Sequence, residues 1–568
     1  MKKLLSLIFA AACVITTKAQ PNATPAWQAN IAGVAEAADV YRTAPVAITA
    51  DGDVYATGRF NQTIAEGDIF LEPVAQSAYL MKYDKEGTAL WAVAVAGSAT
   101  IKSVATDANE NVYIAGTMAD EVVFNTNAGE AVTLKGAMDE FGDYVTAQST
   151  SFIAKYDANG ELLVAKAFVP ARHPDVNGLK DDVNGPYYFP EEDGSFKINN
   201  IAVEGENVYV SANYSGTTNV EGVTFTGSLV NIFFYMIDNL RSAAVFSLDT
   251  NLENAKVIAD FNSAEAMTYD LAYNTTSCDF TVENGTVYVG AVCQGKINMT
   301  TPAGTENFDF YMPGNGDAEY GHVIAAINGN ETSVKIYKAP ANNNTSKESI
   351  EALQVYGDQL YIGGLFNNVF AFDNVFTATN SADIYVAVLD KKTLERNIAY
   401  ISGYDETGTN EVQENFTSLL VADGVIYLNG YTDSISGHVI KDNLSFVIDE
   451  TGISASTSET LTTGAAANKT ALVFAGVDAE GKNTIKYYAD FLTSINDTKE
   501  SQDFNVKYVN GVLTFGETAN VELWSVQGYV IDRAWSVNTL NVNNLPIGCY
   551  IAKITTSNGV NSYKFIKK

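Results

Sequence analysis

The sequence has few of the residues from which metal centres and nucleophilic sites are built. Only four of its 568 residues are cysteines and three are histidines. His173, His322 and His438 each fall in a different stretch of the chain, so a three-histidine metal site would need all of them. The sequence contains no G-x-S-x-G motif, and no cysteine has a histidine close to it. We therefore predict no catalytic residue, no metal ligand and no cofactor.

Basic residues are also scarce. The chain has 34 Lys+Arg against 67 Asp+Glu, a formal net charge of −33. Because nucleic-acid phosphates require a basic surface, this balance argues against a nucleic-acid partner. It favours a soluble protein whose surface resists self-association.

Long apolar runs are missing as well. The longest, Leu4–Ile15, is too short for a transmembrane helix, which needs about 20 residues, so we predict no transmembrane segment. Lys2 and Lys3 precede this run, and Thr17-Lys18-Ala19 follows it as a small-x-small cleavage site. Residues 1–19 therefore read as a secretory signal peptide. The alternative is a lipoprotein signal in which Cys13 is lipidated.

Three cysteines remain once the signal is removed. Cys278 and Cys293 flank a predicted hairpin around Asn284-Gly285. Counted outward from that turn, Cys278 faces Ala291, so Cys293 lies diagonally opposite it. A bulge could close this gap and permit a disulfide in an oxidising compartment. Two packed free thiols are the alternative, and the sequence leaves both open.

The sequence repeats one pattern along most of its length: a polar turn, then β-prone residues centred on an aromatic, then usually glycine. Copies of this pattern are DANENVYIAG at 107–116, DGDVYATG at 51–58, EGENVYVS at 204–211, ENGTVYVG at 283–290, GDQLYIG at 357–363, DGVIYLNG at 423–430 and KTALVFAG at 469–476. A second pattern alternates with it, as in AYLMKYDKEG at 78–87 and FIAKYDANG at 152–160. The unit is strand, turn, strand, loop, strand, turn, strand. Four short strands repeated in this way predict an all-β protein with the blades of a β-propeller.

The number of blades depends on the two ends of the repeat region. The last segment, 465–491, supplies at most about three strands. The region begins with an orphan strand, WQANIA at 27–32, which resembles LWAVAVA at 90–96. An N-terminal strand that completes the last blade would close the ring and remove exposed sheet edges. We therefore predict seven blades over residues 20–493, with six blades as the alternative.

The acidic turn at Asp107-x-Asn109-x-Asn111 looks like the beginning of a calcium loop. Such a loop needs a bidentate acid further on, and a β-prone segment follows here instead. An Asx turn, in which the Asp107 side chain caps the local backbone, is the better interpretation.

The repeats resemble the bacterial β-propeller repeat family typified by xxVYIAGxF and FxAKYDxxGxxxW, over most of residues 27–491. This resemblance implies the propeller fold and says little about the ligand.

One insertion breaks the strand pattern strongly. Residues 169–196 contain four prolines and two acidic clusters on either side of an aromatic run. Binding surfaces on propellers commonly lie in such loops, and tyrosines beside carboxylates suit contact with a sugar or peptide. Aromatics that plug or brace the ring are the alternative. The candidate binding residues are Asp181, Asp182, Tyr187, Tyr188 and Phe189.

The chain ends with a different domain. A polar linker at 494–503 leads to residues 504–568, whose periodicity predicts a small, Ig-like antiparallel β-sandwich. Its six Lys/Arg and three Asp/Glu contrast with the acidic propeller. The motif residues here are Leu545, Pro546, Gly548, Tyr550, Lys564, Lys567 and Lys568.

These motif residues resemble, in order and position, the C-terminal sorting domain of type IX (Por) secretion substrates, with Cys549 as the one departure. The resemblance implies the type IX secretion machinery as a partner. It also implies passage through the periplasm and outer membrane of a Gram-negative cell, removal of this domain, and release or attachment to surface lipopolysaccharide.

Together these features predict an extracellular or surface protein that binds an unidentified glycan, peptide or protein and catalyses no reaction. A secreted propeller hydrolase or lyase acting on polysaccharide is the alternative. Two carboxylates that converge at the centre of the ring would favour the enzyme.

Overall fold

The computed structural model describes residues 24–31, 45–74, 77–127, 129–138, 149–174, 187–188, 194–232, 236–263, 267–268, 275–310, 320–338, 348–369, 372, 377–401, 412–434, 440–449, 452–458, 460–478, 481–489, 506–509, 511–525, 530–545, 548–556 and 559–567. All the named elements in these ranges are strands, which confirms the predicted all-β class. Among the described residues, no helix is both long and apolar enough to cross a membrane.

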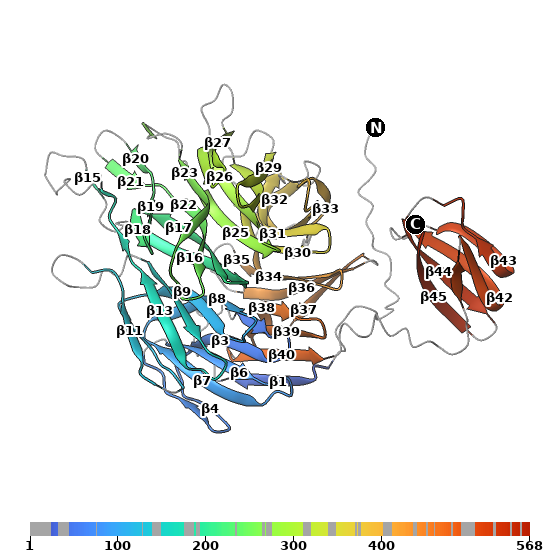
Figure 1. The fold of residues 1–568 in the computed structure, drawn as a ribbon, viewed down its shortest axis with the longest axis horizontal. Coiled ribbons are helices and arrows are strands. Elements are labelled where there is room, and N and C mark those ends of the chain that lie inside the picture. Colours follow the sequence, from blue (N-terminus) through green and yellow to red (C-terminus); the bar gives the residue numbers. More distant parts are fainter. Residues whose placement is uncertain are drawn as a thin grey trace.

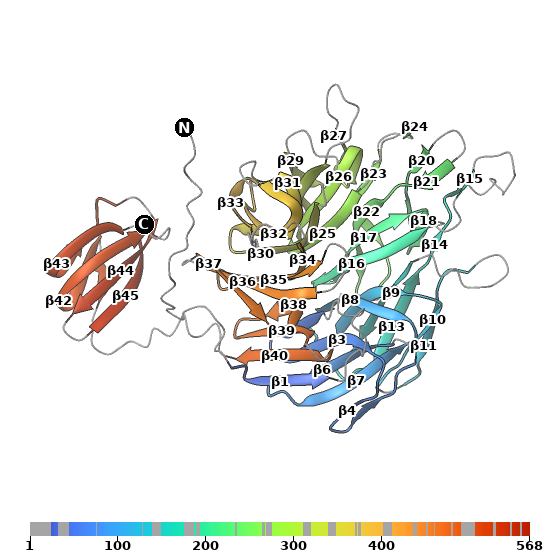
Figure 2. The same ribbon diagram turned by 180° about the vertical axis from the view of Figure 1, so that it is seen from behind.

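Most of the strands form antiparallel sets around a common centre (Figures 1 and 2). The strands that line the centre are β2 (Val46–Ile48), β8 (Ala99–Thr106), β16 (Ser195–Glu204), β25 (Thr275–Glu283), β30 (Ser349–Tyr356), β34 (Val412–Ala422) and β38 (Leu461–Ala467). We call these the inner strands. Each contacts the next in chain order, and β38 contacts β2, so that the inner strands close into a ring.

Each inner strand begins a set of four strands. The second strands are β3 (Val54–Phe60), β9 (Val112–Met118), β17 (Asn207–Ser215), β26 (Thr286–Thr301), β31 (Gln359–Val369), β35 (Val425–Ser434) and β39 (Ala471–Val477). The third strands are β6 (Ser77–Tyr83), β12 (Thr150–Tyr156), β22 (Ser242–Asp249), β28 (Tyr320–Asn328), β32 (Thr377–Asp390), β36 (Ile440–Asp449) and β40 (Asn483–Ala489). The outer strands are β7 (Ala89–Ala96), β13 (Leu162–Phe168), β23 (Lys256–Ser263), β29 (Glu331–Lys338), β33 (Arg396–Ile401), β37 (Gly452–Ser458) and β1 (Trp27–Ile31). Sheets of this kind arranged radially are the architecture of a β-propeller.

The N-terminal strand β1 belongs to the set formed by the last three propeller strands. It pairs antiparallel with β40, from Trp27 opposite Tyr487 to Ile31 opposite Asn483. The sheet order is β1-β40-β39-β38, so the first strand completes the sheet that the end of the propeller region begins. The prediction that the orphan strand completes the last set is confirmed. The pairing covers the edge of β40.

The third strands show why the sequence repeats so closely. All seven residues of β6 are buried, and so are all seven of β12. Because neighbouring sheets cover both faces of these strands, both sets of alternating side chains are excluded from water. The repeated aromatic serves the same packing: Tyr55 and Tyr113 are fully buried in the cores between consecutive sheets.

Additional strands are present beyond the four strands of each set. They are β4 (Ile64–Glu66), β5 (Ile69–Leu71), β10 (Glu121–Phe124), β11 (Val132–Lys135), β14 (Pro170–Ala171), β15 (Tyr187–Tyr188), β18 (Thr217–Val220), β19 (Val223–Thr226), β20 (Leu229–Ile232), β21 (Met236–Asn239), β24 (Met267–Thr268) and β27 (Gly304–Phe310). The long strand β26 also pairs with β27 and with β23, which joins two neighbouring sets into one sheet. Among the additional strands, β10, β11 and β27 extend sheets of the sets, whereas β4–β5, β14–β18–β19 and β15–β21–β20–β24 form small sheets of their own.

The C-terminal region forms a separate sheet of five strands. These are β41 (Lys507–Val509), β42 (Val512–Ser525), β43 (Val530–Asn541), β44 (Gly548–Thr556) and β45 (Gly559–Lys567). The long strand β42 pairs antiparallel with β41, β43 and β44. Leu513, Val521, Leu523, Ala552 and Ile554 are buried in a core of its own. The antiparallel strands agree with the sequence, whereas the Ig-like topology stays a prediction, and the linker at 494–503 lies outside the described residues.

Candidate functional site

The inner strands enclose a central cavity of about 910 Å³. All seven inner strands contribute to its wall. This volume lies within the range of small-molecule binding sites. A cavity that every set helps to build exists only when the ring is closed, so it is a property of the whole propeller region.

The inner strands share a backbone irregularity beside this cavity. In six of them the pairing with the second strand slips by one residue, between Ile101/Ser103, Ile198/Asn200, Thr275/Ser277, Ile350/Ala352, Phe416/Ser418 and Thr462/Gly464. Such β-bulges leave one residue without a partner and redirect its side chain, and they are frequent next to functional sites. Five of the extra residues line the cavity, and we call them the bulge residues: Lys102, Asn199, Glu351, Thr417 and Thr463.

The bulge residues are polar, and two of them also connect neighbouring sets. The Asn199 side-chain amide donates to the Cys278 carbonyl at 3.1 Å, from β16 to β25. The Thr417 hydroxyl donates to the Thr462 carbonyl at 2.6 Å, from β34 to β38. The same irregularity therefore places polar groups on the cavity wall, and a hydrogen bond to the adjacent inner strand fixes the side chains of Asn199 and Thr417.

A chain of hydrogen bonds crosses three inner strands on one side of the cavity. Ser103 Oγ donates to Asn200 Oδ1 at 2.8 Å, and Asn200 Nδ2 donates to Asp279 Oδ1 at 3.0 Å. The backbone N–H of Leu353 also donates to the Asp279 carboxyl group, from β30. Burial raises the pKa of Asp279 to about 7, despite these donors, because the ionised form loses its hydration.

Glu351 faces the cavity next to Asp279 in the ring. Its side chain is solvent-accessible in the cavity, although residues from all seven inner strands line that cavity. Burial therefore raises the pKa of Glu351, while a hydrogen bond from Ser349 and the charge of Lys102 lower it in part. The Glu351 charge in turn helps to raise the pKa of Asp279. The two carboxyl groups thus interact electrostatically across adjacent inner strands.

Cations and apolar groups occupy other parts of the wall. Lys102 on β8 and Lys197 on β16 supply the positive charge. Phe416 and Leu419 on β34 supply an apolar surface. The ring of Phe416 packs against Gly363 of β31, where a Cβ would lie only 2.8 Å from Phe416 Cε2. The absence of a side chain at Gly363 leaves room for the phenyl ring in this position.

The insertion residues that the sequence suggests for binding do not contribute to the cavity wall in the described part of the chain. Tyr187 and Tyr188 form β15, which pairs parallel with β21. Asp181, Asp182 and Phe189 lie outside the described residues. Their role in binding stays a prediction.

Sequence reasoning missed the bulge residues, although a signal for them exists. Asn199, Glu351 and Thr417 each stand ten residues before the repeated tyrosine of their set, at Tyr209, Tyr361 and Tyr427. Lys102 and Thr463 stand eleven residues before Tyr113 and Phe474. A polar residue at this offset marks the cavity wall once the repeats are aligned on their aromatic residue.

The two hairpin cysteines are free. Cys278 pairs with Ala291, the register that the sequence predicts, and a bulge follows between Thr275 and Ser277. The bulge does not bring the two sulfur atoms into a bond, so the disulfide alternative is wrong in this structure. Burial raises the pKa of both thiols, to about 12 for Cys293, which disfavours the reactive thiolate.

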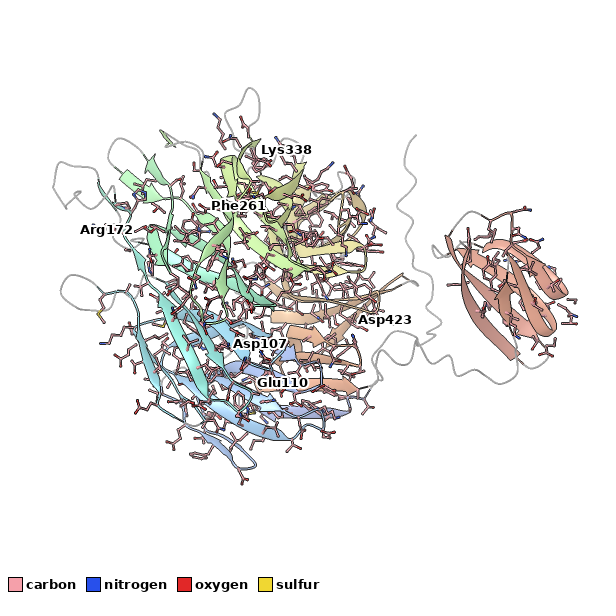
Figure 3. All side chains as sticks on the ribbon, in the orientation of Figure 1. Asp107, Glu110, Arg172, Phe261, Lys338 and Asp423 are labelled. Atoms are coloured by element: carbon pink, nitrogen blue, oxygen red, sulfur yellow. The ribbon has the colours of Figure 1, made fainter. Side chains whose placement is uncertain are left out.

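The calcium-like turn is an Asx turn. Asp107 Oδ1 accepts hydrogen bonds from the backbone N–H groups of Asn109 at 2.9 Å and Asn111 at 3.0 Å. Figure 3 labels Asp107 and Glu110 in this turn. The acid therefore caps local backbone, as the sequence predicts.

Five of the motif residues that the sequence singles out at the end of the chain lie on or beside β44 and β45. Leu545 packs on its core, and Tyr550 in β44 is buried. Gly548 pairs with Lys567, and Ile551 with Lys564, across β44 and β45. Pro546 and Lys568 lie outside the described residues. The structure brings the two halves of the motif onto adjacent strands.

Comparison with known proteins finds distant likenesses of fold. No family model matches the sequence, and no curated protein matches it. The chain is similar to the structure of YCF48 bound to D1 peptide, with 10% identity over 80% of this chain and 97% of that one and a TM-score of 0.33. It is also similar to the β-propeller domain of the Trilobed protease from Pyrococcus furiosus (9%, 79% and 98%, TM-score 0.37) and to the polysaccharide lyase Uly1 (8%, 81% and 92%, TM-score 0.37). Likenesses this distant carry no argument about ligand or activity.

Proposed function

We propose that the chain is an exported or surface-displayed protein that binds a ligand in the central cavity of a seven-bladed propeller, without catalysing a reaction. The observation that carries this proposal is the ring of bulge residues. Five inner strands use the same backbone device to direct a polar side chain into one cavity. Polar groups held in this way, next to an apolar surface, are the usual composition of a ligand site.

Seven blades, as opposed to six, follow from the pairing of the strands. Seven four-stranded sets can be followed among the described residues, and their inner strands form one closed ring. In a six-bladed ring, one of these sets would have to lie outside it. The closing contact between β38 and β2 supports the larger number.

Substitutions that fill the cavity test the binding function. In Thr417→Trp, an indole would occupy the cavity, whereas Thr224→Trp places the same group on an exposed position of β19. We expect the wild-type chain and Thr224→Trp to retain ligands from immobilised glycan and peptide arrays. Thr417→Trp should lose them while still unfolding cooperatively, at a somewhat lower melting temperature because its hydrogen bond to the Thr462 carbonyl is also lost. Equal retention by all three proteins would place the ligand site elsewhere.

Export through the type IX route is supported by the sorting motif and by the separate core of the C-terminal sheet. Mass spectrometry of surface, vesicle and medium fractions from the native cell tests it. We expect the protein outside the cell without residues 504–568. Intact protein retained in the periplasm would contradict this route.

A second candidate is a polysaccharide hydrolase or lyase. The observation that favours it is the interaction between Asp279 and Glu351, because Asp279 has a pKa near 7 and Glu351 a raised one. Paired carboxyl groups with altered pKa values are the usual arrangement for acid–base cleavage of glycosidic bonds. Release of reducing ends from polysaccharide, lost in Glu351→Gln, would establish this activity in place of simple binding.

A further inference from the structure

The charged and apolar groups of the central cavity occupy separate sectors of its wall. Following the ring of contacting inner strands, Lys102 and Lys197 lie on β8 and β16, and Asp279 and Glu351 lie on β25 and β30. Phe416 and Leu419 on β34 come next. The wall therefore presents a cationic, an anionic and an apolar sector in that order.

The anionic sector is incompletely neutralised by the protein. Asp279 already accepts hydrogen bonds from Asn200 and from backbone N–H groups, so its carboxyl oxygens connect the inner strands to one another. The hydrogen bond from Ser349 and the positive charge of Lys102 both lower the pKa of Glu351. Burial raises this pKa by more, so the net shift is upward. A cationic group of a ligand beside Glu351 would stabilise the ionised carboxylate.

The charge balance also limits what the cavity can accept. Two lysines and two carboxyl groups line it, while the chain as a whole carries −33. A polyanion would approach against the field of the whole protein. A simple cation would leave Lys102 and Lys197 without a negative partner from the ligand. A ligand that carries one charge of each sign satisfies both sectors.

We propose that the cavity binds a short peptide through its two charged ends, with the ammonium group at Glu351, the carboxylate at Lys102 and Lys197, and a side chain on the apolar surface of Phe416. This inference rests on the proposed binding function and specifies its ligand. Asn199, Thr417 and Thr463 line the same cavity. The N–H groups of Asn199 and the O–H group of Thr417 already donate within the protein, so Asn199 Oδ1 and Thr417 Oγ are the atoms that would accept hydrogen bonds from peptide N–H groups. Peptide ends and backbone groups match charged and polar partners of this kind.

Native mass spectrometry of the full chain with a degenerate tripeptide library tests the proposal. The library is offered with free ends, with acetylated N-termini, and with amidated C-termini. We expect adducts with the free-ended library, and at least a tenfold weaker apparent affinity when either end is blocked. Chitotriose and cellotriose serve as uncharged probes of similar size.

Substitutions in the cavity wall test which charged sector binds each end of the peptide. In Glu351→Gln, acetylation of the N-terminus should no longer weaken binding, and Glu351→Asp should restore the discrimination. In Lys102→Met, amidation of the C-terminus should no longer weaken binding. Glu395→Gln is the matched control and should behave as wild type: Glu395, in the turn before β33, forms an ion pair with Lys335 on the outside of the propeller region. A merely structural role of Glu351 or Lys102 would weaken all libraries alike.

The other outcomes distinguish a failure of the peptide inference from a failure of the proposed binding function. Equal binding of free and blocked peptides would overturn the recognition of charged ends. Binding of the oligosaccharides alone, lost in Thr417→Trp, would overturn the peptide ligand and keep the cavity as the binding site. Absence of any adduct that depends on Thr417 would overturn both.

Discussion

The indole of Trp91 lies on Gly160 of the neighbouring set. A Cβ at Gly160 would stand 2.8 Å from Trp91 Cδ2, and Trp91 Nε1 donates to the Ala158 carbonyl in the same turn at 2.9 Å. The relationship recurs where the ring closes: Trp27 Nε1 donates to the Lys85 carbonyl, and a Cβ at Gly87 would stand 2.6 Å from Trp27 Cγ. The outer-strand tryptophan and the turn glycine of the repeats are therefore two halves of one contact between sets.

Replacing this glycine should destabilise the propeller. In Gly160→Ala, the new methyl group meets the Trp91 ring at a backbone φ of +82°. Gly424 has nearly the same φ, +78°, with nothing within 4 Å of its Cβ position, so Gly424→Ala carries the backbone strain alone. We expect Gly160→Ala to cost about 1–3 kcal/mol more than Gly424→Ala in urea unfolding, because overpacking adds to strain. Trp91→Ala should abolish this difference, and equal costs with Trp91 present would contradict the contact.

Much of the propeller can be predicted from the sequence because its elements are local. The repeated tyrosine, the Asx-led turn and the hairpin around Asn284-Gly285 depend on neighbours within a few residues. The completing role of β1 could also be predicted, because WQANIA at 27–32 resembles LWAVAVA at 90–96, which contains the outer-strand tryptophan Trp91.

The central cavity could not be predicted in the same way. Lys102 lies between buried Ile101 and Ser103, so β8 reads as an ordinary strand with one solvated face. Only the slip in its pairing with β9 shows that Lys102 is the extra residue of a bulge. The electrostatic effect of Lys102 on Glu351 further depends on closure of the ring, which brings together inner strands far apart in the chain. The alternation of apolar and polar residues reveals neither the bulge at Lys102 nor the closure of the ring.

Lys82 should contribute strongly to stability although it is charged. It is buried in β6, 3.0 Å from Asp53 and 3.3 Å from Glu110 of the next set, with its Nζ 5.3 Å from the centre of the Tyr55 ring. Lys82→Met would leave these carboxylates without their shared cation, and we expect a loss of about 3 kcal/mol in denaturant unfolding.

The exposed pair Lys335–Glu395 provides the control for this substitution. Its atoms lie 2.6 Å apart, but water screens both side chains. Lys335→Met should therefore cost less than about 1 kcal/mol. Equal losses for Lys82→Met and Lys335→Met would show that burial of Lys82 does not determine its contribution.

The two hairpin cysteines should be unreactive until the protein unfolds. Cys278 and Cys293 are buried free thiols with raised pKa values. Iodoacetamide should leave both unmodified in the native protein and label both in urea without reductant, as followed by peptide mapping. Labelling that appears only after reduction would demonstrate a disulfide between them.

Asp279 should make the protein less stable as the pH rises from about 4 to about 7. Its folded-state pKa is about 7 because of burial, with a contribution from the Glu351 charge, whereas an unfolded aspartate has a pKa of about 4. Between these values the folded state holds a proton that the unfolded chain releases, so the free energy of unfolding falls with rising pH. In Asp279→Asn this proton is absent, and we expect a shallower fall in urea-unfolding free energy between pH 4.5 and pH 7.

Asp249→Asn is the control of opposite sign. Hydrogen bonds, first from the Asn254 side chain and then from the backbone N–H groups of Glu253 and Asn251, lower the pKa of Asp249. Its stabilising effect is present above the unfolded pKa and is lost only as the pH falls through the folded pKa, so its removal should leave the slope above pH 4.5 unchanged. An unchanged slope in Asp279→Asn as well would mean that Asp279 titrates in the folded ring as it does in the unfolded chain. The hydrogen bonds from Asn200 and Leu353 would then offset the whole effect of its burial.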